Sequence, residues 1–181
     1  MSATSRVSQD DSMGRVVVIG NGGGGKSTLA KRLAERHNLP WLSVDQMQWG
    51  PGWNLVSDAE VIDRLRVAMS ADRWIIDGWG PWSSIEERLS QSDTIIFVDL
   101  PLWMHFWLAA ERQISIARGG SRSDPVDGCD DLTATRRLFE TIWYVDRELK
   151  PRLTHLIERH AQGREYHHVT TLDQLDRIAA D

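Results

Sequence analysis

Residues 15–28 read RVVVIGNGGGGKST, and this stretch restricts the fold more than any other part of the chain. Its apolar first part, Arg15–Ile19, predicts a buried β-strand. Gly20–Thr28 then follow the pattern G-x-x-x-x-G-K-S, in which the missing Cβ atoms of glycine let backbone N–H groups converge on phosphate oxygens. The helical pattern that comes next points the positive end of its dipole at the same anion. A flexible Gly-rich turn is the alternative, but the strand before the motif and the helix after it favour a phosphate-binding loop.

This loop predicts ATP and Mg²⁺ as ligands, because its residue types have defined roles in binding them. Backbone N–H groups cradle the phosphates, the Lys26 ammonium reaches the β- and γ-phosphates, and the Ser27 hydroxyl binds Mg²⁺. The predicted nucleotide-binding residues are Gly22, Gly23, Gly24, Gly25, Lys26, Ser27 and Thr28.

Strands and helices are predicted to alternate along the whole chain. The five segments with the composition of strands are Arg15–Ile19, Trp41–Val44, Arg73–Asp77, Thr94–Val98 and Tyr166–Thr170. Helical patterns lie after them, and the spacing of capping boxes marks three helix starts at Ser57, Ser84 and Thr171. The long helical pattern at residues 132–159 contains Pro151, which must kink or divide it. Apolar strands separated by helices predict an α/β fold with a five-stranded parallel sheet and helices on both faces.

An aspartate ends each of three predicted strands, at Asp45, Asp77 and Asp99. Ligands of open parallel sheets bind beyond the carboxyl ends of the strands. We therefore expect the three carboxylates to surround the phosphate-binding loop and to form one site with it. A helix cap or a turn is the alternative role for each aspartate.

The chain is rich in tryptophan, with nine among its 181 residues. Most of these indoles are expected in the core or half-buried. Trp49, Trp53, Trp79 and Trp82 lie instead in Gly- and Pro-rich segments that follow two of the strand-ending aspartates. We predict that these four side chains line a substrate pocket, and packing of the loops onto the core is the alternative.

The composition is that of one soluble globular domain. The chain is 41% hydrophobic and 26% charged, and its net charge of -5 provides no general basic surface for nucleic acid. Its longest apolar stretch, Leu100–Ala110, is too short to span a bilayer. We therefore predict neither a membrane partner nor a nucleic-acid partner.

The polar segments of the chain lead to three further expectations. Residues 1–13 have no periodicity, so a disordered tail is predicted there, with Met13 as an alternative start and residues 14–181 as one domain. The single cysteine, Cys129, excludes an intramolecular disulfide and fits a cytoplasmic protein. Cys129 lies in a polar stretch with no base nearby, so we do not expect it to act as a nucleophile.

Four stretches carry a resemblance to a known family: VVVIGNGGGGKSTLA, VDQMQWGPGW, WIIDGW and RLSQSDTIIFVDLPLW. With them the chain resembles the adenylate-kinase-like branch of small P-loop kinases over nearly its whole length after Met13. It resembles most of all the FlaR-type proteins, which carry the labels DNA topology modulation and small AAA-type ATPase. The resemblance implies a P-loop NTPase fold of the nucleoside- and shikimate-kinase kind, a lid at about residues 112–137, and phosphoryl transfer from ATP with Mg²⁺.

The resemblance also covers a motif after the third predicted strand. Nucleotide kinases have D-G-F-P-R there, and this chain has Asp77-Gly-Trp-Gly-Pro81. The match implies that Asp77, together with Ser27, holds Mg²⁺ directly or through water. Trp79 replaces the phenylalanine and no arginine follows Pro81, which disfavours a nucleoside monophosphate as acceptor. Arg88 is the nearest substitute for substrate binding, and a solvated surface arginine is its alternative role.

Arginines flank and follow the segment that corresponds to the kinase lid. Arg112, Arg118, Arg122 and Arg137 match the lid arginines of the family, which neutralise charge on the transferring phosphoryl group. The resemblance therefore implies that these four residues are catalytic, together with Lys26. Ordinary surface charge is the alternative for each of them.

The sequence thus predicts an ATP- and Mg²⁺-dependent phosphotransferase that acts on a small-molecule acceptor as a monomer or homodimer. Asp45 is the residue expected to orient or deprotonate an acceptor hydroxyl. A pocket of tryptophans that is poor in arginine favours an acceptor without a phosphate. The alternatives are a nucleotide-switched ATPase or binding protein and, disfavoured by the acidic composition, a nucleic-acid-associated ATPase.

Overall fold

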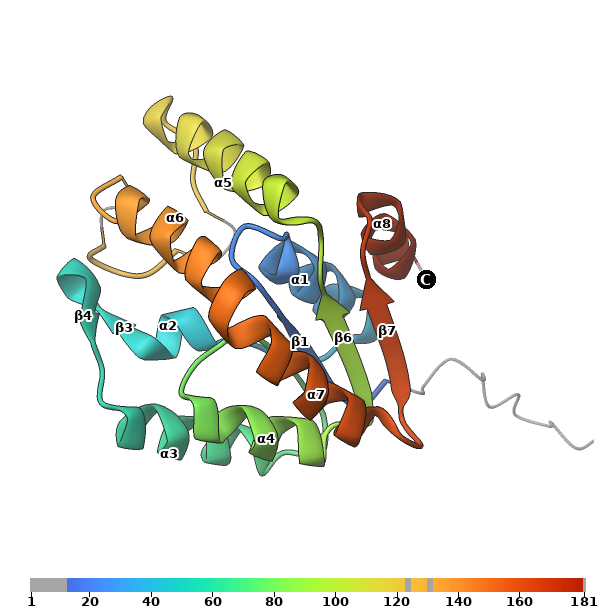
Figure 1. Cartoon of the computed structure of the whole chain (residues 1–181). Coiled ribbons are helices and arrows are strands. Elements are labelled where there is room, and N and C mark those ends of the chain that lie inside the picture. The colour runs from blue at the N-terminus through green and yellow to red at the C-terminus, as the bar shows by residue number, and fades with distance from the viewer. Residues whose placement is uncertain (1–12, 123–124, 130–131, 181) are drawn as a thin grey trace, which may run out of the picture.

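The computed structural model describes residues 13–122, 125–129 and 132–180, and residues 1–12 of the predicted tail lie outside them. A five-stranded parallel sheet in the order β2-β5-β1-β6-β7 forms the centre of the molecule (Figure 1). Its strands are β1 (Arg15–Gly20), β2 (Trp41–Ser43), β5 (Trp74–Asp77), β6 (Thr94–Val98) and β7 (Glu165–Val169). β1 pairs with β5 on one side and with β6 on the other, so the phosphate-binding loop leaves the middle of the sheet. The predicted parallel α/β fold is confirmed.

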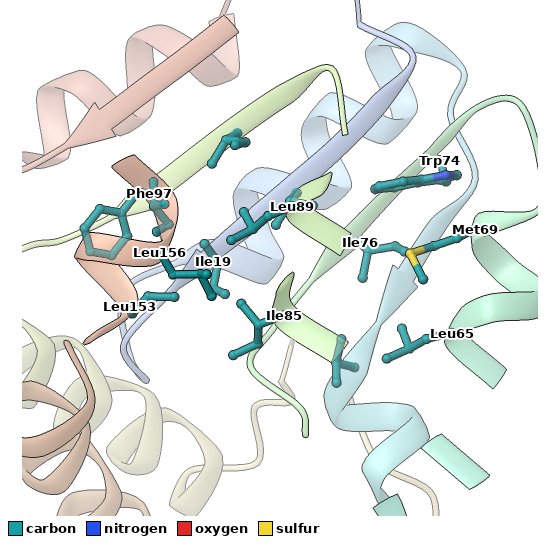
Figure 2. Close-up of a cluster of buried hydrophobic side chains, with 14 of the residues drawn as sticks. Ile19, Leu65, Met69, Trp74, Ile76, Ile85, Leu89, Phe97, Leu153 and Leu156 are labelled. Atoms are coloured by element: carbon teal, nitrogen blue, oxygen red, sulfur yellow. The ribbon is translucent and has the colours of Figure 1, made fainter. Parts of the chain in front are cut away.

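Two layers of helices cover the sheet. Its main covering helices are α1 (Lys26–His37), α3 (Asp58–Met69), α4 (Trp82–Gln91), α7 (Lys150–Ala161) and α8 (Leu172–Ala180). Side chains alternate along β1, so Val16 and Val18 pack with α1 and α8, whereas Val17 and Ile19 pack with α3, α4 and α7. Figure 2 shows the second of these clusters, in which Ile19 lies among side chains of the helices and of the neighbouring strands. Met13, the last residue of the predicted tail, packs against the first cluster and so belongs to the domain.

Polar caps set the ends of the helices. The Ser57 hydroxyl accepts a hydrogen bond from the Glu60 amide at the start of α3. Thr171 and Gln174 bond each other's backbone N–H groups at the start of α8, so the first and third predicted capping boxes are confirmed. The second is wrong, because α4 begins at Trp82 and the Ser84 hydroxyl lies inside the helix, where it donates to the Pro81 carbonyl.

The long helical segment is unbroken, but its winding changes before Pro151. It consists of α6 (Thr135–Tyr144), a π-helical turn (Val145–Leu149) and α7, and Pro151 occupies the first turn of α7. Pro151 has no N–H to donate to the turn before it, and the chain widens there into a π-turn. The end of α6 lies beside the phosphate-binding loop, because the Asn21 side-chain amide donates to the Ile142 carbonyl at 2.8 Å.

The segment after β2 differs from its prediction. The strand ends at Ser43, and Asp45 lies in a short helix, α2 (Val44–Gln48). The predicted loop contains a small antiparallel hairpin, with β3 (Trp49–Gly50) and β4 (Asn54–Leu55) joined by a 3₁₀ turn (Pro51–Trp53). Asp45 is therefore presented by a helix that points into the site and not by the end of a strand.

Helix α5 (Leu102–Ala117) follows β6 and begins directly after Pro101. It lies on the outside of the molecule and packs along α6 (Figure 1). Its side chains Trp103 and Trp107 are 64% and 61% exposed, so these two indoles are not core residues. Trp143 on α6 is also exposed. No helix within the described ranges is long and apolar enough to cross a membrane.

Candidate functional site

A cavity of about 930 Å³ lies at the carboxyl edge of the sheet. The segments that form it follow β1, β2 and β5, and parts of α5, α6 and the π-turn close its far side. The predicted site residues that line it are Gly22, Gly23, Gly24, Gly25, Lys26, Ser27, Thr28, Asp45, Trp49, Trp53, Asp77, Trp79, Arg112, Arg122 and Arg137. Residues far apart in the sequence thus share one space, as ligand binding at a parallel sheet requires.

The phosphate-binding loop passes too close to α5 for any residue but glycine. A Cβ on Gly23 would lie 2.6 Å from the His105 carbonyl oxygen, and a Cβ on Gly24 would lie 2.8 Å from the His105 ring. Gly23 also has a positive φ of 73°, which other residues adopt at a cost. The loop is therefore a preformed cradle of backbone N–H groups at the start of α1, and its shape fits a chain of phosphates.

Asn21 and Lys26 hold this cradle in place. The Asn21 side chain accepts from the Gly22 N–H at 2.7 Å and donates to the Ile142 carbonyl of α6. The Lys26 ammonium donates to the Asn21 carbonyl at 2.6 Å, within the same loop. Asn21 occupies a variable position of the motif, and nothing in the sequence marked it as a site residue.

Ser27 and Asp77 form an oxygen-rich pair at the end of the cradle. The Ser27 hydroxyl donates to Asp77 Oδ2 at 2.5 Å, and the Trp41 indole N–H donates to Asp77 Oδ1 at 2.8 Å. Asp77 is almost fully buried at the end of β5. A hydroxyl and a carboxylate beside a phosphate-binding loop are the hard oxygen donors that Mg²⁺ prefers, so the residues present fit this ion.

His105 supports the loop from α5 and is a second residue that the sequence did not reveal. Its ring is 1% exposed, and Nδ1 lies 2.8 Å from the Gly22 carbonyl oxygen. A carbonyl only accepts, so the Nδ1 atom carries the proton. Burial, with the positive charge of Lys26, lowers the pKa of His105 to about 4. His105 is therefore neutral at pH 7 and adds no charge beneath the phosphates.

This low pKa predicts a specific loss of stability in acid. Between pH 7 and pH 5 the unfolded chain protonates His105, whereas the folded protein does not, so protons favour unfolding in this window. We expect the wild type to lose about 2 kcal/mol more unfolding free energy between these pH values than His105→Gln, which cannot titrate. Urea unfolding of both proteins at pH 7 and pH 5 measures the difference. Equal losses in the two proteins would show that His105 is protonated as easily in the fold as outside it.

Two tryptophans and two arginines form the wall opposite the cradle. The Arg137 guanidinium lies 4.4 Å from the Trp49 ring centre, and the Arg122 guanidinium lies 5.7 Å from that of Trp53. Arg122 also pairs with Asp45 at 3.6 Å. The prediction of an arginine-poor pocket is wrong, because the chain after α5 folds back and brings these cations to the indoles.

The segment at residues 125–129 is attached to the β3–β4 hairpin. The Gly52 N–H donates to the Gly128 carbonyl at 2.8 Å, and the Gln46 amide donates to the Pro125 carbonyl at 3.1 Å. Cys129 Sγ lies 3.2 Å from both the Gly50 carbonyl and the Trp53 N–H. Cys129 thus has a structural role in joining the predicted lid to the hairpin.

Arg88 is a correction to the predicted substrate residues. Its side chain is fully buried, and its pKa falls to about 10 because of that burial, which still leaves it charged at pH 7. The guanidinium donates to the carbonyls of Gly78, Trp79 and Ser84. Arg88 therefore lies behind the site, where it holds the turn after β5, and it is neither a substrate ligand nor a solvated surface residue.

Three further predicted residues lie outside the main cavity. Trp82 packs against the core and under the Arg152 guanidinium. Arg118 lines a separate surface groove beside Trp107. Asp99 forms an ion pair with Lys150, lies 3.1 Å from His168 Nε2, and does not line the cavity. Trp82 and Asp99 contact residues far away in the sequence, which sequence spacing alone did not reveal.

Solved structures share this fold over almost the whole chain. A "putative kinase" from Chloroflexus aurantiacus J-10-fl is 17% identical, has a TM-score of 0.51, and the match covers 93% of this chain and 96% of that one. Shikimate kinase from Acinetobacter baumannii in complex with shikimate is 14% identical, has a TM-score of 0.59, and the match covers 94% of this chain and 90% of that one. No protein-family model matches the sequence, and no curated protein matches it. The likeness shows that the chain shares its fold with these two proteins. The closer resemblance to FlaR-type proteins stays a prediction.

Proposed function

We propose that this protein is an ATP- and Mg²⁺-dependent phosphotransferase that acts on a small-molecule acceptor. One observation carries the proposal: the phosphate cradle, the Ser27–Asp77 pair and the wall of Asp45, tryptophans and arginines face the same cavity. A cavity of about 930 Å³ is at the upper end of small-molecule sites, which suits a nucleotide and an acceptor together. The kinases that share the fold support the same class of reaction.

The residues of the cradle would bind and orient the nucleotide. Backbone N–H groups of Gly22–Gly25 and the Lys26 ammonium would hold the β- and γ-phosphates, while Ser27 and Asp77 would hold the metal ion. Bound Mg²⁺ neutralises charge on the phosphates during transfer. Lys26 would leave its present partner, the Asn21 carbonyl, for a phosphate oxygen. Such positioning is most of what phosphoryl transfer needs from a protein.

The opposite wall would bind the acceptor. Asp45 would accept the proton of the attacking hydroxyl or orient that hydroxyl, and Arg122 now holds Asp45 in the cavity. The Trp49 and Trp53 rings would supply an apolar surface, and Arg112 and Arg137, which line the same cavity, would stabilise charge on the transferring group. The residues at 125–129, which are attached to the hairpin, would help to keep water from this side of the cavity.

A screen of metabolite pools for acceptor-dependent ADP release tests the proposal. The protein alone should hydrolyse ATP slowly, and one small nucleophilic acceptor should stimulate ADP release strongly with formation of a phosphorylated product. Nucleotide-dependent binding of a partner without any acceptor would favour a switch instead. Stimulation by DNA that falls with salt would favour a nucleic-acid-linked ATPase.

Asp45→Asn should lower acceptor-dependent turnover by about a hundredfold or more, because the amide cannot take a proton. The Kd of ATP should stay nearly unchanged, since Asp45 pairs with Arg122 of the acceptor wall and is not part of the cradle. Steady-state kinetics and calorimetric ATP titration measure the two effects. Asp63→Asn, an exposed change of the same kind on α3, is the matched control. A loss of ATP affinity as large as the loss of turnover would contradict the role given to Asp45.

A further inference from the structure

The two oxygens of the Asp77 carboxylate have different partners. Oδ2 accepts from the Ser27 hydroxyl, and Oδ1 accepts from the Trp41 indole N–H. Asp77 is 1% exposed, so water does not compensate for a lost partner as it would at the surface. The indole N–H therefore favours the orientation in which Oδ2 turns toward Ser27.

The sheet and α1 together place Trp41 for this contact. Trp41 pairs with Ile75 in the β2–β5 ladder, and Asp77 lies two residues further along β5, on the same face. Ser27 and Lys31 lie one helical turn apart on α1, above this face. Ser27 bonds the carboxylate, and the Lys31 ammonium lies 4.7 Å from the Trp41 ring centre. The partly buried indole is thus held between the hydrophobic core and the Lys31 ammonium.

We propose that Trp41 is a positioning residue for the magnesium ligand Asp77, an inference that rests on the proposed function. Its N–H holds Oδ1, so that Oδ2 stays beside the Ser27 hydroxyl, with which it would hold the metal ion. An indole N–H is a donor only, so it fixes the carboxylate without competing for the cation. A hydrogen bond to an ionised carboxylate is also stronger than one to a neutral group. Hydrogen bonds of this kind commonly tune the affinity of metal ligands.

Trp74 shows that packing alone does not explain this contact. It lies on β5, it is fully buried, and its indole N–H donates no hydrogen bond within the described ranges. Trp41 is only half-buried, yet its N–H is directed at a carboxylate. The two residues therefore form a matched pair for substitution by phenylalanine. Trp41→Phe removes an N–H that bonds Asp77, whereas Trp74→Phe removes an N–H that does not.

The experiment measures the Kd of ATP by calorimetry, once with Mg²⁺ and once with EDTA. The Kd with EDTA divided by the Kd with Mg²⁺ reports how much the metal strengthens ATP binding. This measurement needs no acceptor. We expect Trp41→Phe to reduce this ratio about tenfold and Trp74→Phe to leave it unchanged. Trp41→His should restore part of the ratio at pH 8, because a neutral imidazole can present an N–H from the same position of its five-membered ring.

The outcomes separate this inference from the proposed function. Equal ratios in Trp41→Phe, Trp74→Phe and the wild type, or equal decreases in both variants, would overturn the role of Trp41 and leave the function standing. A wild type that binds no ATP would overturn the function itself, and the inference with it. Should Trp41→Phe not fold, the Trp41 indole N–H resonance of ¹⁵N-labelled wild type takes its place. That resonance should move in Asp77→Ala, and an unmoved resonance would overturn the inference.

Discussion

Lys26→Ala should remove most of the stabilisation that saturating ATP and Mg²⁺ give to the wild type. Ligand at about 100 times its Kd adds about 2.7 kcal/mol to the unfolding free energy, which raises Tm by roughly 5–10 °C in a chain of this size. Lys26 is the cation within the cradle, and its ammonium already lies in the loop, 2.6 Å from the Asn21 carbonyl. Without the Lys26 ammonium, the β- and γ-phosphates of ATP would lose the side-chain cation that contacts them directly. Thermal unfolding with and without nucleotide measures the shift.

Arg32→Ala on the same helix is the matched control for Lys26→Ala. Arg32 is largely exposed and pairs with Asp176 on α8, away from the cradle. Arg32→Ala should leave the rise in Tm on addition of ATP and Mg²⁺ unchanged. An unchanged shift in Lys26→Ala would mean that the nucleotide binds elsewhere or not at all, and the phosphate-binding role of residues 20–28 would then be wrong.

Arg88→Ala should lower the unfolding free energy by about 3–5 kcal/mol, the range for removing one partner from a buried charged network. The change leaves the carbonyls of Gly78, Trp79 and Ser84 without their donor. It also removes a positive charge that faces the buried Asp77 carboxylate. Urea unfolding at pH 7 measures the loss, and Arg88→Lys should recover only part of it, because a single ammonium cannot reach all three carbonyls.

Arg66→Ala is the control for this second prediction, since Arg66 is an exposed arginine on α3 that pairs with Glu87. It should change stability little, as surface ion pairs usually do. If Arg88→Ala instead kept its stability and raised the KM of an acceptor, Arg88 would be a substrate residue after all. Unfolding free energy and KM of Arg88→Ala, compared with those of Arg66→Ala, thus show whether Arg88 supports the site or binds substrate.

Much of the candidate site could be predicted because its signals are local. A strand, a Gly-rich turn and a helix in direct succession specify the cradle, and Asp77 directly follows an apolar strand. The positions of Arg88 and Asp99 could not be read in this way. Both follow the expected helix and strand patterns, but their partners lie on other segments: Gly78 and Trp79 for the first, Lys150 and His168 for the second.

The sequence by itself determined the succession of the five sheet strands and of the helices that cover them, and it determined the phosphate-binding loop. Backbone propensity, side-chain periodicity and the need for glycine in a tight turn act within a few residues, so they can be read along the chain. Only the tertiary structure decided that Trp41 bonds Asp77, that His105 supports Gly22, and that Arg122 reaches Asp45. These contacts join residues 36, 83 and 77 positions apart, and they depend on how helices pack on the sheet, which no local pattern specifies.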